Sequence, residues 1–539
     1  TRWATHGKPS EENAHPHANA DKSLFVVHNG IIENYVEIKT KLQKDGYKFL
    51  SETDTEVLPQ LIDSFLKQGH SLLNAVRAAL NEIKGTYGIA VVYKNEPDKI
   101  IAAKKGSPLV IGIGENEHYV ASDVNALIGY TSRVVYLEDG EIVEITRDKF
   151  DARTIDDEEI EKVVEEIRVE LNEISKSDYP HYMLKEIFEQ TKSVHDSFRG
   201  RILMDEGTAK LGGIERIADR IANSKRIVIS ACGTSWHAGL VAEYMLEQFS
   251  GIPVEVDYAS EFRYRNPIVN RDDTMFFISQ SGETADTLAA MKEAKRRGAL
   301  ILGVCNVVGS SIARASEAGV YIHAGPEIGV ASTKAFTSQL VVFALISVLL
   351  GRMRHLSLID GQNILKELEL IPSKIEKILK LNDEIEKIAE QFVDSKNFLY
   401  LGRGYNFPVA LEGALKMKEI SYIHAEGYPA AEMKHGPIAL IDENMPVVFI
   451  APKDSVYDKV VNNIEEVKAR KGRLIAIASE NDDEIDNLVD YSIKIPDTIR
   501  MLMPILTSIP LQLLAYHVAV KKGLNVDQPR NLAKSVTVE

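Results

Sequence analysis

A stretch of this chain recurs about 170 residues further on, and this repeat constrains the fold more than any other feature of the sequence. Three pairs of similar segments carry it: 225–234 with 396–405, 274–278 with 444–450, and 298–304 with 472–478. In both copies, short apolar runs typical of buried strands alternate with helical patterns. Such alternation indicates a parallel sheet covered by helices on both faces. We therefore predict an α/β fold with two similar domains in tandem.

Hydroxyl residues follow one predicted strand of the first copy, where a helix should begin. The run 275–278 predicts the strand, and the turn after it holds Ser279, Gln280, Ser281, Gly282 and Thr284. A helix N-terminus offers unpaired N–H groups and a positive dipole end, and glycine lets the backbone approach a ligand closely. An ordinary helix cap would need only one of these hydroxyls. The combination favours a cradle for a phosphate dianion.

The same argument extends to the first strand of this copy. Ser235 follows the predicted strand 226–231, and ligands bind at the carboxyl ends of strands in open parallel sheets. We expect Ser235 to join the cradle. The second copy has Pro452, Lys453 and Asp454 in place of the hydroxyl residues, so we expect one phosphate site of this type.

Composition excludes several classes of protein. A length of 539 residues predicts about three or four domains, and a formal net charge of −16 argues against nucleic acid as a partner. Two cysteines are too few for a disulfide framework or a cysteine metal site, which favours a reducing compartment such as the cytoplasm. The longest apolar run, 340–350, is too short to span a bilayer and predicts a buried helix, so we expect no membrane partner.

The first 150 residues mix short strands and helices and predict an α+β unit with much sheet. From 156 to 174, apolar residues at helical spacing within an acidic stretch predict a charged connecting helix. The chain starts at Thr1 with what reads as the middle of a motif, so we expect an N-terminal truncation.

Other ionisable residues are ambiguous by pattern alone. Glu412, Lys416 and Glu419 share one face of a predicted helix, and this spacing is most often a solvated row of salt bridges. A lone histidine in a turn, His435, is usually structural. His15 and His17 have no further ligands nearby, so we predict no metal. The chain lacks a phosphate-loop lysine motif and a complete dinucleotide fingerprint, so we predict no cofactor.

Longer motifs resemble a known family across essentially the whole chain. Segments 1–7, 13–17, 28–34 and 51–56 resemble a class II glutamine amidotransferase domain. The remaining motifs are similar to those of glucosamine-6-phosphate synthases, and they lie at 279–284, 330–334, 415–421, 434–437 and 527–539. The repeat would then correspond to two sugar isomerase (SIS) domains. The family's cysteine nucleophile precedes the Arg2-Trp3 motif and is not in this sequence.

The resemblance implies an amidotransferase domain over 1–150, with its beginning missing, a helical linker over 151–214 and a first SIS domain over 215–356. A connecting helical segment over 357–386, a second SIS domain over 387–526 and a catalytic tail over 527–539 would follow.

For the first domain, the resemblance implies glutamine hydrolysis. Arg2 would pair with the α-carboxylate of glutamine and Asp54 with its α-amino group. Thr5 and His6 would line the site, with Trp3 as a gate. The oxyanion hole would be formed by the Asn29 side chain and the Gly30 N–H.

For the SIS domains, the resemblance implies that released ammonia converts fructose 6-phosphate into glucosamine 6-phosphate. The phosphate would be held by Ser235, Ser279, Gln280, Ser281 and Thr284. His435 would assist ring opening, Lys534 would form a Schiff base with the ketose, and Glu419 would move a proton between C1 and C2 beside Lys416. The tail would pack into the crevice between or beside the SIS domains.

The family is homodimeric, with sites completed across subunits. Two alternatives remain open: a non-catalytic sugar-phosphate sensor and a plain phosphosugar isomerase. The first would lose Glu419 or Lys534, and the second would leave the motifs of residues 1–56 unexplained.

Overall fold

The computed structural model describes residues 8, 10–167 and 175–537, and divides into two compact units. The first unit holds residues up to the described end at 167, together with short segments at 283–286 and after Lys534. The second unit holds the other described residues, 175–282 and 287–534. Arg2, Trp3, Thr5 and His6 lie outside the described residues.

In its described residues, the first unit is built from two sheets and three α-helices. Its seven-stranded antiparallel sheet has the order β1-β2-β3-β4-β8-β9-β10, and its four-stranded antiparallel sheet has the order β11-β7-β5-β6. The strands of the larger sheet are β1 (His17–Ala18), β2 (Leu24–Ile32), β3 (Gly85–Tyr93), β4 (Glu96–Lys105), β8 (Glu141–Ile145), β9 (Phe150–Thr154) and β10 (Glu159–Ile160). The smaller sheet holds β5 (Val110–Ile113), β6 (His118–Ala121), β7 (Arg133–Tyr136) and β11 (Glu165–Glu166).

Strand β4 shows how the layers of this unit form. Successive side chains of a strand point to opposite faces. Ile101 and Ala103 are buried with the helices α1 (Tyr35–Lys44), α2 (Val57–Lys67) and α3 (Leu72–Glu82), while Ala102 is buried with residues of the smaller sheet. The larger sheet is therefore covered by helices on one face and by the second sheet on the other, as an α+β unit with much sheet requires.

The predicted connecting helix is wrong for its described part. Residues 159–166 contribute two short strands, β10 paired with β9 and β11 paired with β7. Asp157 adopts a left-handed backbone with φ of 80°, which ends any helix. Ile160 and Val164 pack against the sheet core, so burial on a nearby sheet overrides the helical spacing.

The second unit contains two five-stranded sheets in which every pair of neighbouring strands is parallel. The first has the order β15-β14-β16-β17-β18, from β14 (Arg226–Ala231), β15 (Val254–Tyr258), β16 (Asp273–Ser279), β17 (Leu300–Cys305) and β18 (Ala318–Tyr321). The second has the order β20-β19-β21-β22-β23, from β19 (Asn397–Gly402), β20 (His424–Pro429), β21 (Pro446–Ala451), β22 (Arg473–Ser479) and β23 (Tyr491–Ile495). The two orders are equivalent, which confirms the tandem repeat.

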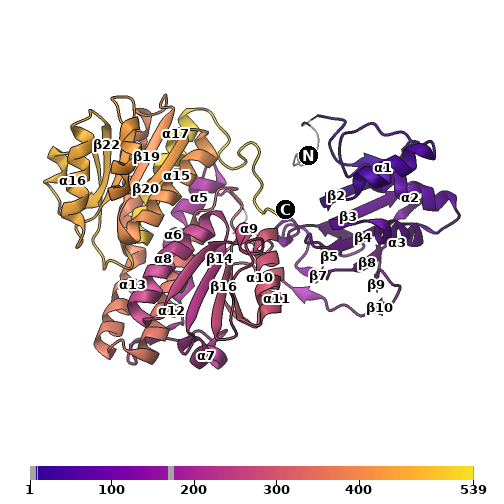
Figure 1. The fold of residues 1–539 in the computed structure, drawn as a ribbon, viewed down its shortest axis with the longest axis horizontal. Coiled ribbons are helices and arrows are strands. Elements are labelled where there is room, and N and C mark those ends of the chain that lie inside the picture. The colour runs from indigo at the N-terminus through magenta and orange to yellow at the C-terminus, as the bar shows by residue number, and fades with distance from the viewer. Residues whose placement is uncertain (1–7, 9, 168–174, 538–539) are drawn as a thin grey trace. The chain divides into compact units, whose positions relative to one another are not determined.

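Helices cover both sheets and join their cores. Helices α8 (Gly233–Ser250) and α12 (Lys334–Arg354) lie beside the first sheet, and α15 (Phe407–Ser421) and α17 (Met503–Lys521) beside the second (Figure 1). One continuous apolar cluster includes residues of all four helices and of both sheets. The other helices of this unit include α5 (Tyr182–Phe188), α6 (Gln190–Phe198), α10 (Ala285–Arg297), α13 (Leu358–Leu379), α14 (Asn382–Glu390) and α16 (Tyr457–Lys468).

Two of these helices, α12 and α17, are long and apolar enough to cross a membrane by length and composition. In each, 94% of the most apolar window is buried inside the protein. Their apolar surface is therefore satisfied by the core, and α12 contains the buried helix predicted at 340–350.

Candidate functional site

The predicted phosphate cradle lies at the carboxyl edge of the first parallel sheet. Strands β14 and β16 are neighbours, with Ala231 opposite Ile278, so the turns that follow them emerge side by side. Strand β15 lies on the other side of β14, which makes this edge the point where the strand order reverses. Open parallel sheets bind ligands at such points.

The turn after β16 has the tight shape that its glycine predicts. The Gly282 N–H donates to Ser279 Oγ at 2.9 Å, and Gly282 has a φ of 69°. A Cβ at this position would lie 2.0 Å from Ser310 Oγ, so a larger residue could not keep this backbone. Thr284 immediately precedes α10. The hydroxyl residues therefore lie at a helix N-terminus.

Several polar groups converge on this edge. Gln339 Nε2 donates to Ser235 Oγ at 3.0 Å, which leaves the hydroxyl proton of Ser235 available to donate. Gln280 Nε2 is buried and has no hydrogen-bond partner among the described residues. An orphaned buried donor at the end of a strand is expected where a polar ligand binds. These groups are neutral, so the cradle would hold an anion by N–H and O–H donors and the helix dipoles.

A buried ionic cluster lies at the start of α8 and along α15. Lys416 Nζ lies 2.6 Å from Glu419 Oε2, 3.3 Å from Glu412 Oε1 and 3.1 Å from Thr234 Oγ1. Glu412 Oε2 lies 2.7 Å from His237 Nδ1, and its Oε1 accepts from Thr234 Oγ1 at 3.0 Å. Through Thr234, which directly precedes Ser235, this cluster is tied to the turn that follows β14.

The prediction of a solvated salt-bridge row is wrong. The side chain of Lys416 is 0% exposed and that of Glu412 is 2% exposed, while Glu419 keeps 22% exposure. Helical spacing correctly placed the three residues on one face, but it cannot say what covers that face. Helix α8 covers it, through Thr234 and His237.

Electrostatics keeps Lys416 charged. Burial alone would lower its pKa, but the carboxylates of Glu412 and Glu419 outweigh burial and hold the pKa above its ordinary value. Burial likewise would raise the pKa of Glu412, but Lys416 and the hydrogen bond from His237 hold it below its ordinary value. A fixed ammonium therefore lies beside a partly exposed carboxylate, Glu419.

Lys534 is held in the second unit by groups that sequence reasoning missed. Its Nζ donates to Glu327 Oε2 at 2.6 Å and to the Gly329 carbonyl at 2.8 Å. Glu327 is buried, and it also accepts from the N–H groups of Thr333 and Ala335. The signal that could have found it is an acidic residue in the short glycine-containing loop just before the 330–334 motif.

The tail is anchored before it reaches Lys534. The Asp527 carboxylate accepts from the Tyr182 and Met183 N–H groups at 3.0 and 2.9 Å, and the Asp527 carbonyl accepts from Val330 N–H at 3.0 Å. Arg530 N–H donates to the Tyr422 hydroxyl at 2.8 Å. This part of the tail is therefore packed, as predicted, beside the 327–335 loop and the end of α15.

His435 is not brought together with these residues. It is exposed at the end of a short 3-10 helix, Ala430–His435. Among the described residues, no hydrogen bond or ion pair joins it to Glu419, Lys416 or Lys534.

The first unit places the described residues of the predicted glutamine site around β2. Asp54 is buried, and its Oδ2 accepts from Ile32 N–H at 2.8 Å. Gly30 has a φ of 145°, and a Cβ there would lie 2.2 Å from the Thr86 carbonyl oxygen. Asn29 Nδ2 donates to Thr537 Oγ1 at 2.5 Å. The amide of Asn29 is thus in use as a donor, which is the role an oxyanion hole requires.

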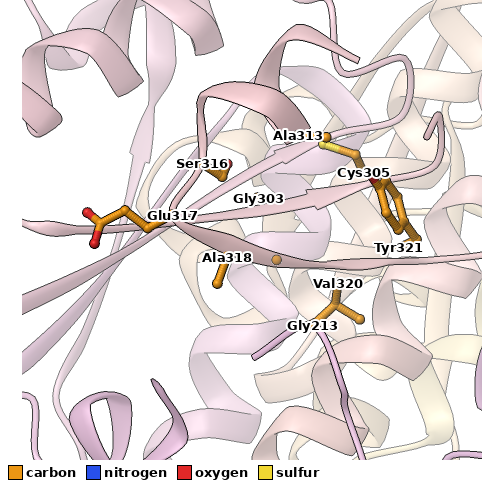
Figure 2. Close-up of a pocket in the computed structure, with 10 residues that line it drawn as sticks. Gly213, Gly303, Cys305, Ala313, Ser316, Glu317, Ala318, Val320 and Tyr321 are labelled. Carbon is orange, nitrogen blue, oxygen red and sulfur yellow. The ribbon is translucent and has the colours of Figure 1, made fainter. Parts of the chain in front are cut away.

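A separate pocket of about 260 Å³ lies along β17 and β18 (Figure 2). Its lining includes Gly213, Cys305, Ser316, Glu317 and Tyr321. None of the predicted site residues is among the ten residues that line it.

Comparison with known proteins matches both units. A SIS domain model matches residues 220–349 and 391–522, and a glutamine amidotransferase domain model matches residues 2–129. The chain is 58% identical over 541 residues to a glutamine–fructose-6-phosphate aminotransferase (isomerizing) of Chlorobaculum tepidum, and 55% identical over 545 residues to one of Bacteroides thetaiotaomicron. Each alignment covers 100% of this chain and 88% of the relative. The C-terminal domain of the glucosamine-fructose-6-phosphate aminotransferase of Francisella tularensis superposes with a TM-score of 0.63 at 42% identity, covering 66% of this chain and all of that one.

Proposed function

Because this chain belongs to the isomerizing glutamine–fructose-6-phosphate aminotransferases, we propose how its residues carry out that reaction. The enzyme transfers the amide nitrogen of glutamine to fructose 6-phosphate and forms glucosamine 6-phosphate and glutamate. The observation that carries this function is the sequence identity of 58% to a relative of that name, which extends over the amidotransferase domain and both SIS domains. A plain phosphosugar isomerase would not require the amidotransferase domain. A non-catalytic sensor would not require the charged cluster on α15, nor Lys534 in the tail bonded to Glu327 and Gly329.

The sugar phosphate is bound at the carboxyl edge of the first SIS sheet. Ser279, Gln280, Ser281 and Thr284 donate to the phosphate oxygens from the turn after β16, and Ser235 donates from the turn after β14. The adjacency of β14 and β16 and the orphaned Gln280 Nε2 support this assignment.

Lys534 is the amine that reacts with the open-chain ketose. Its nitrogen bonds to C2, the carbonyl oxygen leaves as water, and ammonia then displaces the lysine from the imine. Glu419 moves a proton between C1 and C2, and the Lys416 ammonium stabilises negative charge that develops on the sugar. The partial exposure of Glu419 beside a fully buried Lys416 supports this division of roles.

His435 assists ring opening from a second copy of the chain in a homodimer. Its exposure, and the absence of any contact with the charged cluster within the described chain, support a contribution across a subunit interface. A proton donor for ring opening must reach the ring oxygen of the bound sugar.

In the first unit, Asn29 and the Gly30 N–H stabilise the oxyanion during glutamine hydrolysis, and Asp54 binds the α-amino group of glutamine. The burial of Asp54 and the donor role of the Asn29 amide support these assignments. Arg2 pairs with the α-carboxylate, Thr5 and His6 line the site and Trp3 gates it, on the basis of the sequence motif alone.

We also propose a cytoplasmic location, in keeping with a sequence that holds two cysteines. The proposed domains run over 1–150, 215–356 and 387–526, with a linker at 151–214, a connecting segment at 357–386 and the catalytic tail at 527–539.

The test is direct. The purified protein is incubated with fructose 6-phosphate and ammonia, and the product is identified by mass spectrometry after chromatographic separation, because glucose 6-phosphate and fructose 6-phosphate have the same mass. Glucosamine 6-phosphate is the expected product, and Glu419→Gln is the matched inactive control. Glucose 6-phosphate as the sole product, with or without ammonia, would instead indicate an isomerase, and no turnover together with tight fructose 6-phosphate binding would indicate a sensor.

A further inference from the structure

Glu186, on α5 in the segment before the first SIS sheet, is buried next to the group that holds Lys534. Its Oε1 accepts from the N–H groups of Ile328 and Gly329 at 2.6 and 3.0 Å. These two residues directly follow Glu327, and the Gly329 carbonyl is one of the two acceptors of Lys534 Nζ. Glu186 therefore fixes the turn that presents both acceptors to the amine.

We propose that Glu186 is a positioning residue for the amine of Lys534, and that it acts by clamping the Ile328–Gly329 turn in its neutral, protonated form. The inference deepens the proposed function, since it assumes that Lys534 is the reacting amine. Among the described residues, no hydrogen bond or ion pair joins Glu186 to Lys534 directly.

The second oxygen of Glu186 bears on which form of the side chain is present. Oε1 takes two N–H bonds, which a carbonyl or a carboxylate oxygen can accept, while Oε2 is buried without a hydrogen-bond partner among the described residues. A bare anionic oxygen in such a place would be costly, whereas a hydroxyl there costs less. Burial and the nearby Glu327 carboxylate accordingly raise the pKa of Glu186 to about 8.

The charged groups near Glu186 are already paired with one another, without a contribution from Glu186 itself. The groups that act on Glu186 are Glu327, Lys534 and Lys334. Lys334 forms an ion pair with Glu189 at 2.7 Å, and Glu189 forms a second one with Lys185 on α5 at 3.1 Å. The Asp527 carboxylate accepts hydrogen bonds from the first N–H groups of α5. Among the described residues, Glu327 is then the one carboxylate that is ion-paired with Lys534.

A second anion would work against the reaction. If Glu186 ionised, its charge would stabilise the ammonium form of Lys534, so less neutral amine would be available to attack the ketose. Protonated Glu186 supplies the two hydrogen bonds of the clamp without adding that charge.

The experiment measures borohydride trapping of fructose 6-phosphate on the full chain across the pH range, with the adduct located by peptide mass spectrometry. Glu186→Gln keeps an acceptor for both N–H bonds and is always neutral. It should trap at near wild-type rate near neutral pH, and faster than wild type above about pH 8, where wild-type Glu186 ionises.

Glu186→Ala loses the clamp and should trap on the order of 10²-fold more slowly, with the KM for fructose 6-phosphate little changed because the phosphate cradle is elsewhere. Glu376→Gln, an exposed change on α13, is the matched control and should match wild type at every pH.

Each outcome has a clear meaning. An adduct at wild-type rate in Glu186→Ala, or a Glu186→Gln profile parallel to wild type at all pH values, would overturn the inference while leaving the Lys534 role in place. If Glu186→Ala fails to fold, the Glu186→Gln profile alone decides, because a merely structural residue would not change the alkaline limb. The absence of any Lys534 adduct in active wild-type enzyme would overturn the proposed Schiff-base role, and the inference with it.

Discussion

Lys416 Nζ lies 2.6 Å from Glu419 Oε2, and the lysine is fully buried while the carboxylate keeps partial exposure. An exposed salt bridge is worth at most about 1 kcal/mol, and its loss would hardly affect activity. A buried cation that holds one accessible carboxylate has a different consequence, because it fixes the position of the group that we propose as the base.

Replacing that carboxylate tests its role. Glu419→Gln keeps the shape of the side chain and removes the basic oxygen, so we expect a loss of about 10²–10⁴-fold in kcat for glucosamine 6-phosphate formation. Binding of fructose 6-phosphate, measured by calorimetry, should be kept. Normal turnover in this variant would show that Glu419 is only structural.

Glu412 gives a prediction for stability against pH. The pKa of Glu412 in the folded state lies below its ordinary value of 4.5. Its contribution to the free energy of unfolding is therefore present above pH 4.5 and is lost as the pH falls through the folded pKa. Glu412→Gln should lower the stability of the fold by about 3 kcal/mol near neutral pH, since it removes one partner of a buried charge. Thermal unfolding should show the difference from wild type shrinking in acid. A difference that stays constant with pH would contradict the ion pair.

The phosphate cradle is predicted to act through neutral donors. Ser281→Ala combined with Thr284→Ala removes two hydrogen bonds to a charged group, each worth about 1.5–3 kcal/mol. Calorimetry should show weaker binding of fructose 6-phosphate, and of inorganic phosphate as a probe of the same cradle. Ser373→Ala, on α13 with its hydroxyl bonded to its own helix, is the control. An unchanged affinity in the double variant would remove this turn from the site.

The tail gives the fourth prediction. Lys534→Arg keeps the positive charge beside Glu327 but cannot form a Schiff base, so synthesis should be abolished while the unfolding temperature stays close to wild type. Asp527→Asn weakens the anchor at α5 and should reduce the rate while keeping some activity, because Lys534 is still present. Synthesis by Lys534→Arg at wild-type rate would exclude the lysine as the reacting amine.

Much of the architecture could be read from the sequence because strand signals are local. The strand at 226–231 was predicted with its observed bounds, and the repeat gave the second SIS sheet from the first. The cradle followed from the same source, since hydroxyl residues between a buried strand and a helix must lie at the sheet edge.

Only the tertiary structure decided which charges are buried and what holds them. The spacing of Glu412, Lys416 and Glu419 defines a helix face, but its burial depends on α8, more than 150 residues earlier in the chain. Residues 159–166 have helical spacing yet form strands, because a sheet is there to receive Ile160 and Val164. Glu327 binds Lys534, and Glu186 binds the turn that follows Glu327, although the three residues come from distant parts of the chain. A sequence pattern records periodicity along one segment, whereas burial and pKa depend on groups that folding brings from other segments, and that is why the site chemistry required the structure.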